Sequence, residues 1–164
     1  MSRSIDLLKK RYLENIKEKP DLFVGIELEY PVINLEGKAT DSEVVKDLFR
    51  YLPSVLGFTI EKVDDFGNPI QLFDPVSQDT ILFEVSYTTI EFAFGRAEFI
   101  QEVEVRFRDY MDLIQKKLSK ANYAIIGSGI HPYWDKNDNQ PVAYARYQML
   151  MNYLKLSRTV LGTD

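Results

Sequence analysis

Two glutamates separated by one residue are the first residues in this sequence that suggest chemistry. Glu27 and Glu29 lie in the segment VGIELEY (residues 24–30), in which the apolar residues occupy the alternate positions. In a β-strand this pattern turns the apolar side chains to one face and both glutamates to the other. Two residues along a strand span about 6.7 Å, so the carboxylates could converge on one cation, or on two cations about 4 Å apart. The alternative is a solvated polar face that binds nothing.

A predicted β-hairpin further along the chain carries two more glutamates. Glu91 projects between Ile90 and Phe92, away from the apolar face of its strand. Glu84 lies in the preceding run ILFEV, also opposite the apolar positions, and the hairpin register decides whether it shares a face with Glu91. Carboxylate oxygens in this number suit Mg²⁺ or Mn²⁺ better than zinc. Exposed glutamates with no connection to one another are the alternative.

His131, Arg146 and Tyr147 are further candidates for a binding site. His131 is the only histidine and follows GSGI, and its neutral imidazole could ligate a metal or simply form hydrogen bonds. Arg146 and Tyr147 open a predicted helix, and an arginine can bind a carboxylate or a phosphate through two hydrogen bonds. A surface arginine beside packing aromatics would look the same in sequence. No Ser-His-Asp or Cys-His arrangement can be assembled from this chain.

Hydrophobic periodicity predicts the elements that position these residues. Apolar residues at steps of three and four predict helices at about residues 4–19, 41–51, 99–118 and 144–156. Alternation and short apolar runs predict strands at about residues 23–34, 58–63, 70–73, 80–85, 89–94 and 123–126. The middle four are separated by short turn-forming segments, which predicts an antiparallel meander. The predicted fold class is α+β, a mainly antiparallel sheet with helices packed on one face.

Local signals predict where some of these elements begin and end. Thr40 and Glu43 have the spacing of a capping box before the second helix, and Pro53 and Gly57 are expected to end it. Pro20 is expected to stop the first helix. The segment GSGIHPYWDKNDNQP, residues 127–141, is predicted to be a loop because it is rich in turn-forming residues.

Composition limits the classes of function. The chain has 164 residues, 45% of them hydrophobic, which is enough for one domain with one core. A net charge of −5 without a long basic run argues against a nucleic-acid partner, and the absence of cysteine excludes disulfides and thiolate metal sites. The first residues lack the apolar core of a signal peptide, and no apolar run approaches the roughly 20 residues that cross a bilayer. We therefore expect a soluble, cytoplasmic protein without a membrane partner.

Four motifs occur in a recognisable order along the chain. They are VGIELEY at 24–30, LFEV at 82–85 with IEF at 90–92, GIHPY at 129–133 and ARYQM at 145–149. In this order they resemble the glutamate-cysteine ligases and related carboxylate-amine ligases: the metal-binding Gly-x-Glu-x-Glu strand, the paired-glutamate hairpin, the Gly-x-x-Pro-type loop and the Arg-Tyr helix start. Two departures stand out. The segment before Glu91 is one residue longer than the Glu-Pro-Gly-Gly turn of some members, and His131 replaces a different residue in part of the family.

The resemblance implies a glutamine synthetase-like sheet that holds Mg²⁺ or Mn²⁺, ATP and glutamate. The γ-carboxylate of glutamate would be phosphorylated to an acyl phosphate and then attacked by the amine of cysteine. The implied metal ligands are Glu27, Glu29, Glu91, Glu84 and His131. The implied substrate-binding residues are Arg146 and Tyr147. A ligase for another amine, or a non-catalytic binding module of the same fold, is the alternative.

The resemblance covers residues 23–153 but only the first part of the family's usual length. We therefore expect residues 1–164 to be the truncated N-terminal part of a single catalytic domain, with little or no ligase activity alone. A sheet cut in this way would leave an edge and an apolar face exposed, so the chain is also expected to associate with itself.

Overall fold

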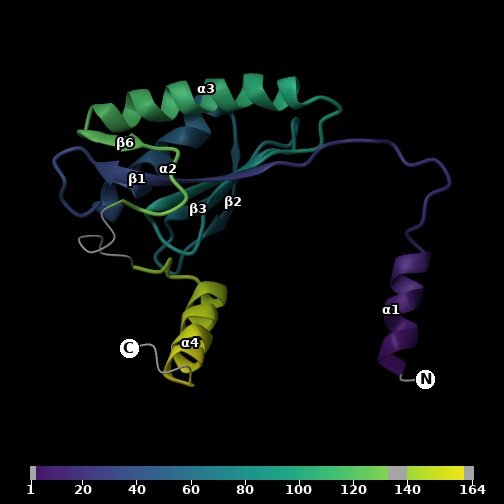
Figure 1. The fold of residues 1–164 in the computed structure, drawn as a ribbon. Coiled ribbons are helices and arrows are strands. Elements are labelled where there is room, and N and C mark those ends of the chain that lie inside the picture. The colour runs from purple at the N-terminus through teal and green to yellow at the C-terminus, as the bar shows by residue number, and fades with distance from the viewer. Residues whose placement is uncertain (1–2, 133–139, 161–164) are drawn as a thin grey trace.

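The computed structural model describes residues 3–132 and 140–160, and within it an antiparallel sheet of six strands forms the centre (Figure 1). The strands are β1 (Glu27–Asn34), β2 (Thr59–Val63), β3 (Pro69–Phe73), β4 (Thr80–Phe83), β5 (Thr89–Ala93) and β6 (Tyr123–Ile125). Their order across the sheet is β2-β3-β4-β5-β1-β6, which confirms the predicted meander from β2 to β5. Residues 133–139 of the predicted loop lie outside the described residues.

The described residues also form four helices, so the predicted α+β class is confirmed. They are α1 (Arg3–Leu13), α2 (Ser42–Leu56), α3 (Ile100–Ser119) and α4 (Ala145–Val160). The prediction that the helices pack on one face of the sheet holds for α2 and α3, which also pack against each other. It is wrong for α4, which lies on the side away from α3, and for α1, which stands apart from the sheet (Figure 1). Within the described ranges, no helix combines the length and the apolar character that crossing a membrane requires.

The hydrophobic core fills the layer between the sheet and helices α2 and α3. Apolar side chains of β4 and β5, such as Phe83 and Phe92, are almost fully buried there. Phe49 of α2 stacks on Phe83 with ring centres 3.8 Å apart. Successive side chains of a strand point to opposite faces. One face of the sheet therefore packs in this core, and the polar side chains lie on the other face.

The ends of α2 differ from the prediction in two respects. Pro53 lies inside the helix, which continues to Leu56 and ends at Gly57 in the left-handed conformation, with φ 75°. The helix tolerates Pro53 because the buried face that includes Leu52 holds it against the core. The N-cap is Asp41, whose side chain accepts a hydrogen bond from the Glu43 amide, rather than Thr40. Thr40 instead donates its hydroxyl to the Val32 carbonyl at 2.7 Å.

Helix α1 is shorter than predicted and buries none of its residues. It ends at Leu13 instead of continuing to about Lys19. Ile5, Leu8 and Tyr12, which share one face by their spacing, are 45%, 57% and 75% exposed. A helix of this length in water depends on tertiary packing of its apolar face, so the early end of α1 is consistent with its lack of a buried face.

A buried carboxylate joins α3 to the sheet. Asp79, which is 1% exposed, accepts hydrogen bonds from Arg106 Nε and the Tyr110 hydroxyl of α3, both at 2.8 Å. Its other oxygen accepts from the Gly95 amide, also at 2.8 Å. A Cβ on Gly95 would lie 2.0 Å from the Ser77 carbonyl oxygen, so only glycine fits at this approach.

Candidate functional site

Four glutamates share the face of the sheet that α2 and α3 leave uncovered. Glu29 of β1 is the direct cross-strand partner of Glu91 of β5, and Glu27 precedes Glu29 by two residues on the same face. Leu82 pairs with Glu91 in the hairpin, so Glu84, two residues after Leu82, also projects to this face. The register between β4 and β5, which the sequence does not determine, therefore places Glu84 on the same face as Glu27, Glu29 and Glu91.

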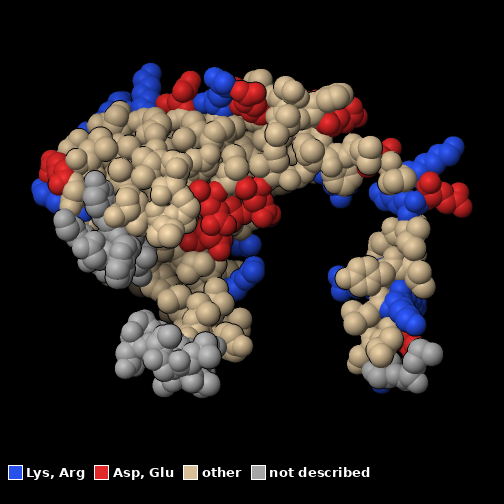
Figure 2. Space-filling view, viewed as in Figure 1, with Lys and Arg blue, Asp and Glu red and all other residues tan. Residues whose placement is uncertain are grey.

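The neighbouring glutamates affect the pKa of Glu91. The pKa of Glu91 is raised to about 7, first because burial disfavours its charged form. A hydrogen bond with Glu84 and the negative charges of Glu84, Glu27 and Glu29 raise it further. Near neutral pH, Glu91 is therefore protonated in part of the population, and the cluster carries fewer negative charges than its four carboxyl groups could supply. Figure 2 shows acidic side chains gathered in one patch on the side of the sheet toward α4.

The donor set fits Mg²⁺ in chemistry, while the side-chain positions do not yet form a coordination shell. In residues 3–132 and 140–160, no three carboxylate or histidine side chains are placed so that they could hold one ion. Directly paired residues such as Glu29 and Glu91 have Cβ atoms about 5 Å apart, and a glutamate has three rotatable bonds. Side-chain rotation alone can therefore direct their oxygens to a common cation, and the proton on Glu91 must leave first.

A pocket of about 470 Å³ opens beside the cluster. Glu29 and Glu84 line it from the sheet, Gly129 and His131 from the segment after β6, and Met151 from α4. This volume lies within the range of sites for small ligands. No lysine or arginine is among the described residues that line the pocket, so an anion bound there would need a cation to offset the glutamates.

His131 is buried at the rim of this pocket and is held by hydrogen bonds. Its Nε2 lies 3.0 Å from the Val32 carbonyl and 3.4 Å from the Thr40 hydroxyl. A carbonyl only accepts, so Nε2 carries a proton in this arrangement and donates it to Val32. The metal role predicted for His131 would therefore have to use Nδ1. As placed, the imidazole holds the segment after β6 against β1.

The two predicted substrate-binding residues lie at the start of α4, on the glutamate side. The Tyr147 hydroxyl donates to the Phe83 carbonyl at 3.0 Å. The pKa of Tyr147 is raised, first by burial and then by the charges of Glu84 and Glu91, whereas the Arg146 guanidinium acts in the opposite direction. Tyr147 thus borders the cluster, and Arg146 is exposed beside it.

The segment before α4 is anchored by residues that the sequence does not single out. The Tyr87 hydroxyl donates to buried Asp64 at 2.7 Å and accepts from the Ala143 amide at 3.0 Å. The Val142 amide donates to the Val85 carbonyl at 2.8 Å. These partners come from distant parts of the chain, so no local spacing could have identified them. Through them the β4–β5 hairpin fixes the position of Arg146 and Tyr147.

The raised pKa of Glu91 predicts an unusual pH dependence of stability. Its pKa is about 7 in the folded chain and near 4.5 otherwise, so its stabilising contribution is fully present below about pH 4.5 and is lost as the pH rises through 7. Without divalent cations, the free energy of unfolding is expected to fall by about 2 kcal/mol between pH 5 and pH 8. Urea unfolding at each pH measures it. Glu91→Gln should flatten the profile, and the exposed control Glu18→Gln should not; equal slopes in all three proteins would contradict the prediction.

The molecule thus has one packed face and one charged face of the same sheet. The charged face carries four glutamates, a pocket beside them, and the start of α4. Comparisons of this chain with models of protein families, with curated proteins and with solved structures gave no match.

Proposed function

We propose that this chain provides the metal-binding sheet face of a Mg²⁺- and ATP-dependent carboxylate-amine ligase similar to the glutamate-cysteine ligases. The observation that supports the proposal most directly is the meeting of Glu27, Glu29, Glu84 and Glu91 on the open face of the sheet. Like charges at this spacing repel one another, and a cation is the usual means of holding several carboxylates together. The chain's resemblance to the ligases involves the same residues.

In this proposal the glutamates act on the phosphoryl groups of ATP through a bound cation. Glu27, Glu29 and Glu91, with Glu84 as a further donor, would hold Mg²⁺. Bound Mg²⁺ would neutralise the charge that develops on the phosphates during transfer. The pocket beside Glu29 and Glu84 has room for an amino-acid substrate.

The reaction proposed for this face has two steps. An oxygen of the substrate γ-carboxylate attacks the terminal phosphorus of ATP, ADP leaves, and an acyl phosphate forms. The amine of the second substrate then attacks the acyl carbon, loses a proton, and releases phosphate as the amide forms. Arg146, at the start of α4, would bind a carboxylate or a phosphate of the reactants. The choice of cysteine as the amine rests only on the resemblance to the glutamate-cysteine ligases. A ligase for another amine would use the same sheet face.

The test is an assay of phosphate release with Mg²⁺-ATP, glutamate and a panel of amines that includes cysteine. It should be run on this chain and, if the gene encodes more residues, on its whole product. We expect little or no turnover by the chain alone, because the described residues that line its pocket include no basic side chain. The whole product should form a γ-glutamyl amide with one amine in the panel. If no amine supports release above ATP alone, the ligase assignment is wrong.

A further inference from the structure

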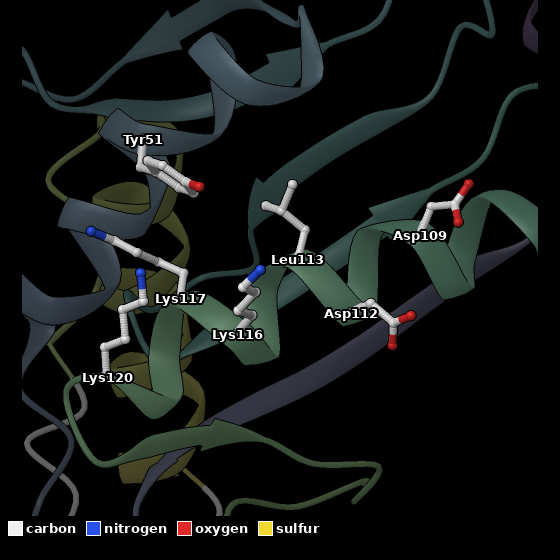
Figure 3. A pocket seen from close by; sticks show the side chains of 7 residues that line it. All are labelled: Tyr51, Asp109, Asp112, Leu113, Lys116, Lys117 and Lys120. Atoms are coloured by element: carbon white, nitrogen blue, oxygen red, sulfur yellow. The ribbon is translucent and has the colours of Figure 1, made fainter.

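A second pocket lies between α2 and α3, away from the glutamate face. It has a volume of about 390 Å³, and Figure 3 shows the side chains that line it. Helices α2 and α3 cover the face of the sheet opposite the glutamates, so the core separates this pocket from the proposed active site. None of its lining residues has a part in the proposed reaction.

Three lysines near the end of α3 share the side of the helix that faces this pocket. Lys116, Lys117 and Lys120 follow Leu113 at helical steps of three, four and seven residues, which places all four side chains on one side. Their ammonium groups extend from α3 toward the side on which Tyr51 of α2 lies (Figure 3). The Lys117 ammonium is 4.9 Å from the centre of the Tyr51 ring.

These ammonium groups have no carboxylate partner within the described part of the chain, because none of its ion pairs includes them. Asp112 and Lys116 have the spacing of a helical ion pair, yet the Asp112 carboxylate points away from the Lys116 ammonium (Figure 3). Like charges at steps of three and four destabilise a helix. The helix dipole favours basic residues near this end of α3, but it does not require three of them to line one pocket.

We infer that this pocket binds a small phosphorylated molecule through Lys116, Lys117 and Lys120. Ammonium groups bind phosphate as point charges, and three of them match a ligand with two or more negative charges. Tyr51 and Leu113 supply the less polar part of the wall.

Asp109 and Asp112 favour a small ligand over an extended polyanion. Both line the same pocket, further toward the start of α3. Their carboxylates would repel an acidic chain that continued along the helix. The inference does not rest on the proposed ligase function.

The test is a calorimetric titration of the chain with inorganic pyrophosphate at low salt, in buffer freed of divalent cations. We expect saturable binding that is weakened at least about tenfold when Lys116, Lys117 and Lys120 are all changed to Gln. The matched control changes Lys9, Lys10 and Lys62 to Gln, and it should bind as the unaltered chain does. Melting temperatures of both triple variants establish that they fold.

Three outcomes would overturn the inference. They are no saturable binding, equal weakening in the two triple variants, and a hexaglutamate peptide that binds as tightly as pyrophosphate. Glu91→Gln separates this site from the glutamate face, because pyrophosphate binding to that variant should be unchanged. Tighter binding to Glu91→Gln, which removes a carboxylate that repels anions, would place the pyrophosphate at the glutamate face and overturn the assignment to α2 and α3.

Discussion

Changing Glu29 to Gln is expected to weaken Mn²⁺ binding by at least about 100-fold, because loss of a residue that only supports a ligand already costs up to that much. Glu29 is the cross-strand partner of Glu91 and also lines the adjacent pocket, so it lies at the centre of the proposed cation site. Glutamine keeps the size of the side chain but loses the charge that attracts the ion. Electron paramagnetic resonance of free Mn²⁺ during titration measures the affinity directly.

The same variant should fold as well as the unaltered chain. Glu29 is exposed, and loss of its charge lowers the repulsion acting on Glu91. The melting temperature without metal is therefore expected to stay the same or rise. The matched control is Glu98→Gln, an exposed glutamate outside the strands of the sheet. Unchanged Mn²⁺ affinity in Glu29→Gln, or an equal loss in the control, would remove the glutamate face as the metal site.

Changing Asp79 to Ala is expected to lower the free energy of unfolding by about 3–5 kcal/mol. Asp79 accepts hydrogen bonds from Arg106, Tyr110 and Gly95 in the interior. Its loss would leave the Arg106 guanidinium without its counter-charge, although one nitrogen of that group already lacks a hydrogen-bond partner. The penalty is therefore mainly that of a charge left unpaired, and urea unfolding measures it.

Two further variants test this explanation. Asp109→Ala removes an exposed carboxylate from the same helix and should cost less than about 0.5 kcal/mol. Changing Arg106 to Met in the Asp79→Ala background should recover part of the lost stability, because it removes the unpaired charge. If Asp79→Ala loses less than about 1 kcal/mol, the network does not join α3 to the sheet in the way that its geometry indicates.

The sequence by itself determined the elements and the face of each strand on which a residue lies. The alternation around Glu27 and Glu29 is a local pattern, and the backbone of a strand converts it directly into two faces. The meander also follows from local signals, since short turn-forming segments force neighbouring strands to pair. Residues such as Phe49 and Ile114 are identifiable as core by helical spacing alone. The α+β class therefore needed no information about long-range contacts.

Only the tertiary structure decided which of these faces meet. The pairing of β1 with β5 puts Glu29 opposite Glu91, and a shift of one residue would have turned Glu91 to the core. Contacts between distant segments likewise bury Asp79 and keep Pro53 inside α2. The pocket lined by Lys116, Lys117 and Lys120 forms because α2 and α3 pack together. Helix α1 has the apolar spacing of a packed helix, yet none of its residues is buried. Strand register and helix packing depend on the free energy of the whole core, which cannot be calculated from a local sequence pattern.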